Sequence, residues 1–261
     1  MQLFDTHTHI FSADYPLDVE EVLARAQAAG VAGLICVGTT AQDSSLAVQF
    51  AQLRPDCWAT VGLHPHDAKD GQEAFVIMER LVSQGARHSP SKIVAIGECG
   101  LDYFYTHSPK DLQLAALRFQ FELAQRAGLP MTFHVREAFD DFWPLFDEFP
   151  ATRGVIHSFT DSQENLDKAL TRGLYIGVNG IATFAKNDSQ IEMYKRIPLE
   201  RMVLETDAPF LTPVPLRGKV NESAYVSHVC KFLAELRQES EEEIAARTTQ
   251  NALTLFNLQL S

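Results

Sequence analysis

The chain has 261 residues, of which 46% are hydrophobic and 21% charged, and these proportions are typical of a soluble globular protein with a sizeable core. Its formal net charge of −12 argues against tight, non-specific binding to duplex DNA, which depends on Lys and Arg contacts to phosphates. No stretch approaches the roughly 18 uninterrupted apolar residues of a membrane span, so no membrane association is expected.

The N-terminus and the cysteines both indicate a reducing compartment. The first residues carry no basic segment followed by a long apolar run, so no signal peptide is predicted. Four cysteines stand far apart in the sequence, and no CxxC pair occurs among them. We therefore predict free thiols and a cytoplasmic location, and nothing indicates an obligate protein partner.

Short runs rich in Val, Ile, Leu and Phe recur along the chain and are typical of strands buried on both faces. There are eight such runs. They are Leu3–His9, Gly33–Thr39, Cys57–His64, Ile93–Gly100, Met131–Arg136, Gly154–Phe159, Leu174–Asn179 and Met202–Asp207.

Amphipathic stretches between and after these runs are predicted as helices. They are Asp18–Ala29, Ser108–Ala127, Ser162–Thr171, Ser189–Arg196, Ala224–Leu236 and Glu241–Phe256. Alternating strands and helices indicate a parallel sheet, and eight repeats favour a closed (β/α)8 TIM barrel of about 250 residues. A doubly wound open sheet is the structural alternative. Without a linker or repeat, we predict one α/β domain over residues 1–261.

A His-x-His pair lies at the end of the first predicted strand. Residues two apart in a strand point to the same side, so Asp5, His7 and His9 share a face. Two imidazoles at this spacing can bind one divalent first-row metal ion. On its own the pair is more simply read as two polar loop residues.

Further metal-binding side chains lie near the ends of four other predicted strands: Glu98, His134, His157 and Asp207. Functional residues of barrel proteins gather at this end of the strands. Six candidate ligands exceed the three or so that one catalytic metal ion takes from the protein. The sequence therefore predicts two divalent ions, Zn, Mg or Mn, with the Glu98 carboxylate bridging them.

Six motifs carry a resemblance to a known family. They are FDTHTH (4–9), GLHPH (62–66), GECGLDYF (97–104), FHVREA (133–138), HSFTDS (157–162) and ETDAPFLTPVPLRGKVNES (205–223). In order and spacing they resemble the TatD family of metal-dependent hydrolases. The resemblance implies a TIM barrel, deoxyribonuclease activity, and metal ligands at His7, His9, Glu98, His134, His157 and Asp207.

Two motifs depart from the family's pattern without losing a ligand. Ser158 and Asp161 stand where the family often has Cys and Gly, and Ser223 stands where Pro is common. These departures bear on substrate preference. Related amidohydrolases use a modified Lys at the place of Glu98, but the nearest lysine, Lys92, lies at the opposite end of that strand, which argues against this chemistry.

Several other residues are candidates for contact with substrate. Glu205 is predicted as a catalytic residue that orients a histidine or water, with pairing to a buried cation as the alternative. The predicted substrate-binding residues are His64, Arg136, Arg217 and Lys219. The last three are cations, which suit the phosphate oxygens of a nucleic acid. For the three cations, solvated loop charges are the alternative. His66 is predicted to line the same pocket, and His88, His107 and His228 are predicted as surface residues.

The expected activity is phosphodiester hydrolysis of transiently bound DNA, with Asp207 as general base and Glu98 as a further catalytic residue. The same metal core also suits a small-molecule amide, lactone or phosphoester hydrolase, and the acidic surface mildly favours that alternative. A non-catalytic metal-binding barrel is a third reading. This third interpretation is the weakest, because all six candidate ligand positions carry a side chain that can bind a metal ion, and a protein that had lost catalysis would be expected to have lost some of them.

Overall fold

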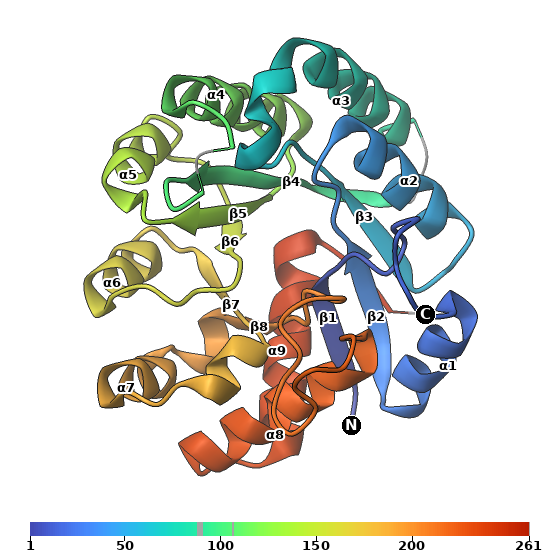
Figure 1. The fold of residues 1–261 in the computed structure, drawn as a ribbon, viewed down its shortest axis with the longest axis vertical. Helices are drawn as coiled ribbons and strands as arrows, with labels where there is room; N and C mark the ends of the chain where they lie inside the picture. The colour runs from blue at the N-terminus through green and yellow to red at the C-terminus, as the bar shows by residue number, and fades with distance from the viewer. Residues whose placement is uncertain (88–90, 106, 261) are drawn as a thin grey trace. The chain divides into compact units, whose positions relative to one another are not determined.

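The computed structural model describes residues 1–87, 91–105 and 107–260, which fall into two compact units. The terminal unit comprises Met1–Ile35 and Ser158–Ser261, and the central unit comprises Cys36–His157. Within the described residues, strands and helices alternate along the chain (Figure 1). The strands are β1 (Leu3–Thr8), β2 (Val31–Cys36), β3 (Cys57–Val61), β4 (Ile93–Asp102), β5 (Met131–Arg136), β6 (Gly154–Ile156), β7 (Tyr175–Val178) and β8 (Met202–Leu204). The α-helices are α1 (Val19–Ala28), α2 (Ala41–Gln52), α3 (Gly71–Gly85), α4 (Lys110–Ala127), α5 (Phe139–Asp147), α6 (Gln163–Thr171), α7 (Asp188–Arg196), α8 (Val226–Arg237) and α9 (Glu241–Phe256).

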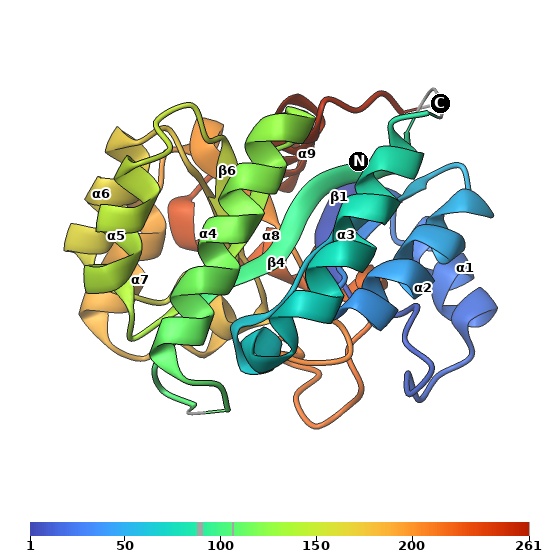
Figure 2. The ribbon, with the colours of Figure 1, turned by 90° about the horizontal axis from the view of Figure 1, so that it is seen from above.

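The central unit is built on four neighbouring parallel strands, β3 to β6. The longest of them, β4, is buried over its whole length, which explains its nearly continuous apolar sequence. Helix α4 packs against β4 and lies beside α3, which contacts β3 (Figure 2). Helix α4 ends at Gly128, whose backbone φ of 67° is the left-handed conformation that terminates many helices.

Aromatic side chains fill the space between α4, β5 and α5. Phe133 of β5 is fully buried, and its ring centroid lies 5.5 Å from that of Phe121 and 5.2 Å from that of Phe142. Phe146 completes the group at 5.9 Å from Phe133. This packing fixes β5, the strand that carries His134, against the helices of the same unit.

The terminal unit joins the first strand to the last. Strands β7 and β8 pair in parallel, and Thr8 at the end of β1 forms a parallel bridge with Ala208 beyond β8. Helices α8 and α9 pack on each other and on β1 (Figure 1). The buried Asn251 of α9 donates hydrogen bonds of 2.7 Å to the carbonyls of Leu199 and Met202, where β8 begins.

All eight predicted strands are present, but several end earlier than predicted. For example, β8 ends at Leu204 and not at Asp207, and β3 ends at Val61 and not at His64. The six predicted helices are confirmed within a few residues, and α2, α3 and α5 are additional. Among the described residues, no helix combines the length and apolar character needed to cross a membrane. The single domain over residues 1–261 stays a prediction.

The cap of α9 gives a prediction about stability. The Ser240 hydroxyl accepts a 3.1 Å hydrogen bond from the backbone N–H of Glu243 in the first turn of that helix. Replacing Ser240 by Ala removes this bond, so we expect the free energy of unfolding to fall by about 1 kcal/mol. The melting temperature, followed by circular dichroism, should fall by roughly 2–4 °C.

Ser83→Ala is the matched control for this helix cap. Ser83 is exposed near the end of α3, and its hydroxyl donates only to the carbonyl of Arg80 in the same helix. The melting temperature of this variant should stay within the error of the measurement. Equal losses in the two variants would show that the hydroxyl of Ser240 contributes nothing as a cap.

Candidate metal-binding and active site

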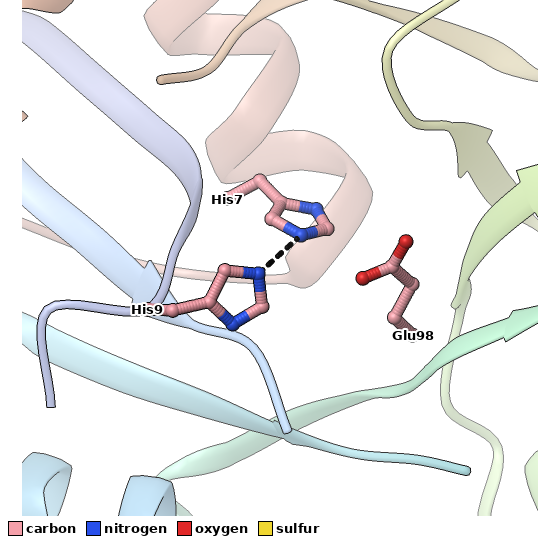
Figure 3. Close-up of side chains that lie close together, drawn as sticks. All are labelled: His7, His9 and Glu98. Atoms are coloured by element: carbon pink, nitrogen blue, oxygen red, sulfur yellow. Dashed lines mark hydrogen bonds between the residues drawn. The ribbon is translucent and has the colours of Figure 1, made fainter. Parts of the chain in front are cut away.

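Three predicted ligands come together in the terminal unit and are called the His7 cluster: His7, His9 and Asp207. The Nε2 atoms of His7 and His9 lie 3.2 Å apart. Figure 3 draws this contact as a dashed line between the two rings. Both face the same Oδ1 atom of Asp207, at 3.6 Å from His7 and 3.4 Å from His9. Ligand atoms held 2.0–2.1 Å from a tetrahedral ion are roughly 3.3 Å apart, so these three donors fit one divalent ion.

The backbone around the His7 cluster holds Asp207 in an uncommon conformation. Asp207 has a φ of 60°, in the left-handed region that non-glycine residues rarely adopt. Its N–H donates to the carbonyl of His7 at 2.8 Å, and the N–H of His9 donates to Ala208 at 2.7 Å. These bonds connect the segments after β1 and β8 and bring the carboxylate to the two imidazoles.

Asp5 lies beneath the His7 cluster and is fully buried. Its carboxylate accepts hydrogen bonds from the N–H of Thr206 at 2.9 Å and from the Thr206 hydroxyl at 2.7 Å. Burial raises the pKa of Asp5 to about 7, although the hydrogen bonds from Ser223, Thr206 and His7 oppose the shift. Asp5 therefore joins the two segments that carry His7 and Asp207.

The central unit contains a second group, called here the Glu98 cluster: His64, His66, Glu98, Asp102 and His134. The Oε1 atom of Glu98 lies 3.0 Å from His134 Nδ1 and 3.5 Å from His64 Nε2. The Oδ2 atom of Asp102 lies 2.9 Å from His134 Nε2 and 3.1 Å from His66 Nε2. Two carboxylates and three imidazoles thus form a continuous chain, with His134 between the two carboxylates.

The electrostatics of the Glu98 cluster follow from burial and these contacts. Burial lowers the pKa of His64 to about 3, so this imidazole is neutral and able to bind a metal ion. Burial also disfavours protonation of His134, but its hydrogen bonds to Asp102 and Glu98 outweigh this and raise its pKa. Burial disfavours the charged form of Asp102, yet hydrogen bonds from His134 and Tyr105 hold its pKa below the ordinary value.

The donors of the Glu98 cluster also fit a metal ion. One ligand atom each from His64, Glu98 and His134 lies within 4.8 Å of the other two. Neutral imidazoles and a carboxylate are ligands that divalent first-row metals accept. His157 follows β6 directly, is 6% exposed, and lies close enough to His134 to oppose the rise in the pKa of His134.

Two buried glutamines of α4 position the Glu98 cluster. The Gln120 side chain accepts a 2.8 Å hydrogen bond from the backbone N–H of Leu63 and donates a 3.0 Å hydrogen bond to the carbonyl of the same residue. Leu63 directly precedes His64 in the chain. Gln113 makes the same pair of bonds, at 2.8 and 3.0 Å, to the backbone of Asp102. One helix thereby fixes two segments that carry site residues.

Glu205 is a buried carboxylate that accepts hydrogen bonds from two segments of the terminal unit. It is 1% exposed, and its Oε1 atom accepts from the N–H of Ser158 at 2.7 Å and from Asn179 Nδ2 at 3.2 Å. Ser158 follows His157 in the chain and has a φ of 50°. Glu205 therefore stabilises the backbone turn directly after a predicted ligand.

The predicted phosphate-binding cations are all exposed, and two of them lie on aromatic rings. Arg136, the last residue of β5, places its guanidinium carbon 4.0 Å from the ring centroid of Phe104. Arg217 lies 4.1 Å from the centroid of Phe184 in the terminal unit. Lys219 lies in the same loop as Arg217.

The roles of Asp102, Gln113 and Gln120 were not foreseen from the sequence, although Asp102 belongs to the quoted GECGLDYF motif.

Among the predicted surface histidines, His107 is exposed but its ring centroid lies 4.6 Å from that of His66. His88 lies outside the described residues. Lys92 donates to the backbone carbonyls of Arg54, Pro55 and Cys57 at the opposite end of β4, consistent with the prediction that it is no metal ligand.

Comparison with protein families and known proteins gives consistent matches over nearly the whole chain. The family model of TatD related DNases matches residues 4–257. The chain is 38% identical to an uncharacterized metal-dependent hydrolase, YabD, of Bacillus subtilis, covering 98% of this chain and 99% of that protein. It is 36% identical to the 3'-5' ssDNA/RNA exonuclease TatD of Citrobacter rodentium, covering 99% of both.

The solved structures agree with these sequence matches. The crystal structure of YJJV, a TatD homolog from Escherichia coli K12, matches with a TM-score of 0.90 and 30% identity over 98% of both chains. A phosphotriesterase homology protein from Escherichia coli, at 18% identity and a TM-score of 0.67, shares the fold alone. The (β/α)8 fold predicted from the sequence is confirmed.

Proposed function

This chain belongs to the family of TatD-related DNases, and from that premise we propose that it hydrolyses phosphodiester bonds of single-stranded nucleic acid. It is a metal-dependent hydrolase of the TatD type. Relatives named as 3'-5' ssDNA/RNA exonucleases support the choice of substrate. The observation that carries the proposal is the presence of two groups of metal-binding donors at or just after the ends of β-strands, with exposed Arg136 at the end of β5 in the central unit and exposed Arg217 in a loop of the terminal unit.

The six residues that we propose as metal ligands are His7, His9, Glu98, His134, His157 and Asp207. The number and chemistry of these donors suit two divalent ions, Zn, Mg or Mn, with Glu98 as the shared carboxylate. When bound, such ions lower the pKa of water towards neutrality and neutralise charge on a phosphoryl oxygen. This assignment rests on the donor distances within each cluster and on the family.

The protein's own side chains supply the remaining steps. The Asp207 carboxylate accepts the proton of the attacking water and acts as general base. Arg136, Arg217 and Lys219 bind phosphate oxygens of the strand and offset the charge that grows there. His64 contacts the substrate, and Glu205 supports catalysis by holding the backbone next to His157.

The proposal is tested with one oligonucleotide sequence, offered once as a single strand and once as a blunt duplex. The purified protein should degrade a labelled single strand with Mg²⁺ or Mn²⁺ and lose this activity when the metal is chelated. A blunt duplex of the same sequence should be cut about 10-fold more slowly, because opening each terminal step costs about 1.4 kcal/mol. Labels at the 5' and 3' ends reveal the direction of degradation.

Two results would contradict the proposal. Degradation that continues unchanged after the metal is chelated would exclude a metal-dependent nuclease. Turnover of small chromogenic esters that exceeds the turnover of DNA by orders of magnitude would favour the small-molecule hydrolase instead.

A further inference from the structure

Two exposed aromatic rings lie beside the Glu98 cluster, and its chemistry makes no use of them. Phe104 is 49% exposed and Tyr105 is 42% exposed, directly after β4. Their ring centroids are 4.7 Å apart in an edge-on arrangement. Two adjacent exposed rings offer flat apolar faces on which another planar group can stack. We call Phe104, Tyr105 and the neighbouring Arg136 the aromatic platform.

The aromatic platform is tied firmly to the Glu98 cluster. The Oδ1 atom of Asp102 accepts hydrogen bonds from the N–H groups of Phe104 at 3.0 Å and Tyr105 at 2.8 Å. The Oδ2 atom of the same carboxylate contacts His134 at 2.9 Å. The Tyr105 ring also lies edge-on to His66, with centroids 5.4 Å apart. The rings are therefore held in place next to a predicted metal ligand.

Arg136 gives the platform a positive charge. Its guanidinium carbon lies 4.0 Å from the Phe104 centroid and 4.9 Å from the Tyr105 centroid. Within the part of the chain that the structure describes, it pairs with no carboxylate, although the net charge is −12. A guanidinium that lies on rings keeps its N–H groups available for a phosphate.

We propose that the aromatic platform binds the unpaired end of a nucleic acid strand, with bases stacked on Phe104 and Tyr105 and a phosphate bound by Arg136. The proposal rests on the phosphodiesterase function proposed above and adds the feature that is recognised, the flat face of an unpaired base. Alternating rings and cations are how proteins bind single strands without sequence preference. In a duplex these base faces are covered by neighbouring base pairs, so the platform selects unpaired ends.

The test removes either the bases or the rings. One oligonucleotide has ordinary nucleotides throughout, and a second has the same phosphates but abasic sugars in its last two positions at the degraded end. For the unmodified protein, we expect kcat/KM to be about 10-fold or more higher on the ordinary strand, which corresponds to stacking of one base. In the double variant Phe104→Ala/Tyr105→Ala the ratio of kcat/KM on the ordinary strand to kcat/KM on the abasic strand should fall to about one, whatever the activity on the abasic strand.

Matched variants separate stacking from a general loss of apolar surface. Phe104→Tyr should keep the preference for the ordinary strand, whereas Phe104→Leu should weaken it. Leu53→Ala, an 80% exposed position at the end of α2, should leave it unchanged. Equal hydrolysis of both strands by the unmodified protein would overturn the stacking proposal alone. Hydrolysis of neither strand would overturn the proposed function, and this inference with it.

Discussion

Glu98→Gln is expected to lower kcat/KM on single-stranded DNA on the order of 10³-fold. The Glu98 carboxylate lies 3.0 Å from His134 Nδ1 and 3.5 Å from His64 Nε2, and the substitution keeps its shape but removes its charge. A bound divalent ion would lose a charged oxygen ligand, and the loss of about 4 kcal/mol of transition-state stabilisation corresponds to this factor. Steady-state hydrolysis and the metal content of the purified variant, from mass spectrometry, measure the effect.

Glu79→Gln is the control for this substitution. Glu79 is exposed on α3 and, among the residues that the structure describes, pairs only with Arg126, so removing its charge should change neither hydrolysis nor metal content. Full nuclease activity in purified Glu98→Gln would contradict the role given to this carboxylate. It would also indicate that the activity comes from a contaminating enzyme.

The sequence predicted the strands better than the helices because buried parallel strands have an unmistakable apolar run. Helix α4 was also predictable, since its end is marked by a glycine in a left-handed conformation. Helix α5 was not. Its sequence, with Pro144 inside and four aromatic residues among nine, lacks the usual helical signals, and the helix is stabilised by packing on β5.

The candidate ligands could be proposed from the sequence because strand ends in a barrel lie on one side, whereas the residues that position them could not. Gln113 and Gln120 look like ordinary polar residues on a helix, and only the fold reveals that both are buried. Gln120 acts on Leu63, which is 57 residues away in the sequence. The strand ends were misjudged for a related reason: beyond Leu204 the chain leaves the regular ladder and reaches a left-handed backbone at Asp207.

Asp102→Asn is expected to weaken metal binding by about 10–100-fold without removing a ligand. The Oδ2 atom of Asp102 lies 2.9 Å from His134 Nε2, so this carboxylate keeps a proton on Nε2, and a metal ion bound by Nδ1 would take the place of the proton that Nδ1 donates to Glu98. An asparagine that keeps the backbone bonds to Phe104 and Tyr105 presents an NH₂ group to His134 instead. The proton is then driven to Nδ1, where it blocks coordination.

A metal titration distinguishes this role of Asp102 from a merely structural one. The apparent Kd for Mn²⁺, from direct binding and from activity, should rise together by the same factor, while hydrolysis at saturating metal largely recovers. Asp141→Asn is the matched control, because Asp141 accepts only from the Tyr103 hydroxyl at 2.7 Å and contacts no imidazole. An unchanged Kd in Asp102→Asn would refute the assignment of the proton. Activity that stays low at saturating metal would mean that Asp102 acts on the backbone of the platform and not on His134.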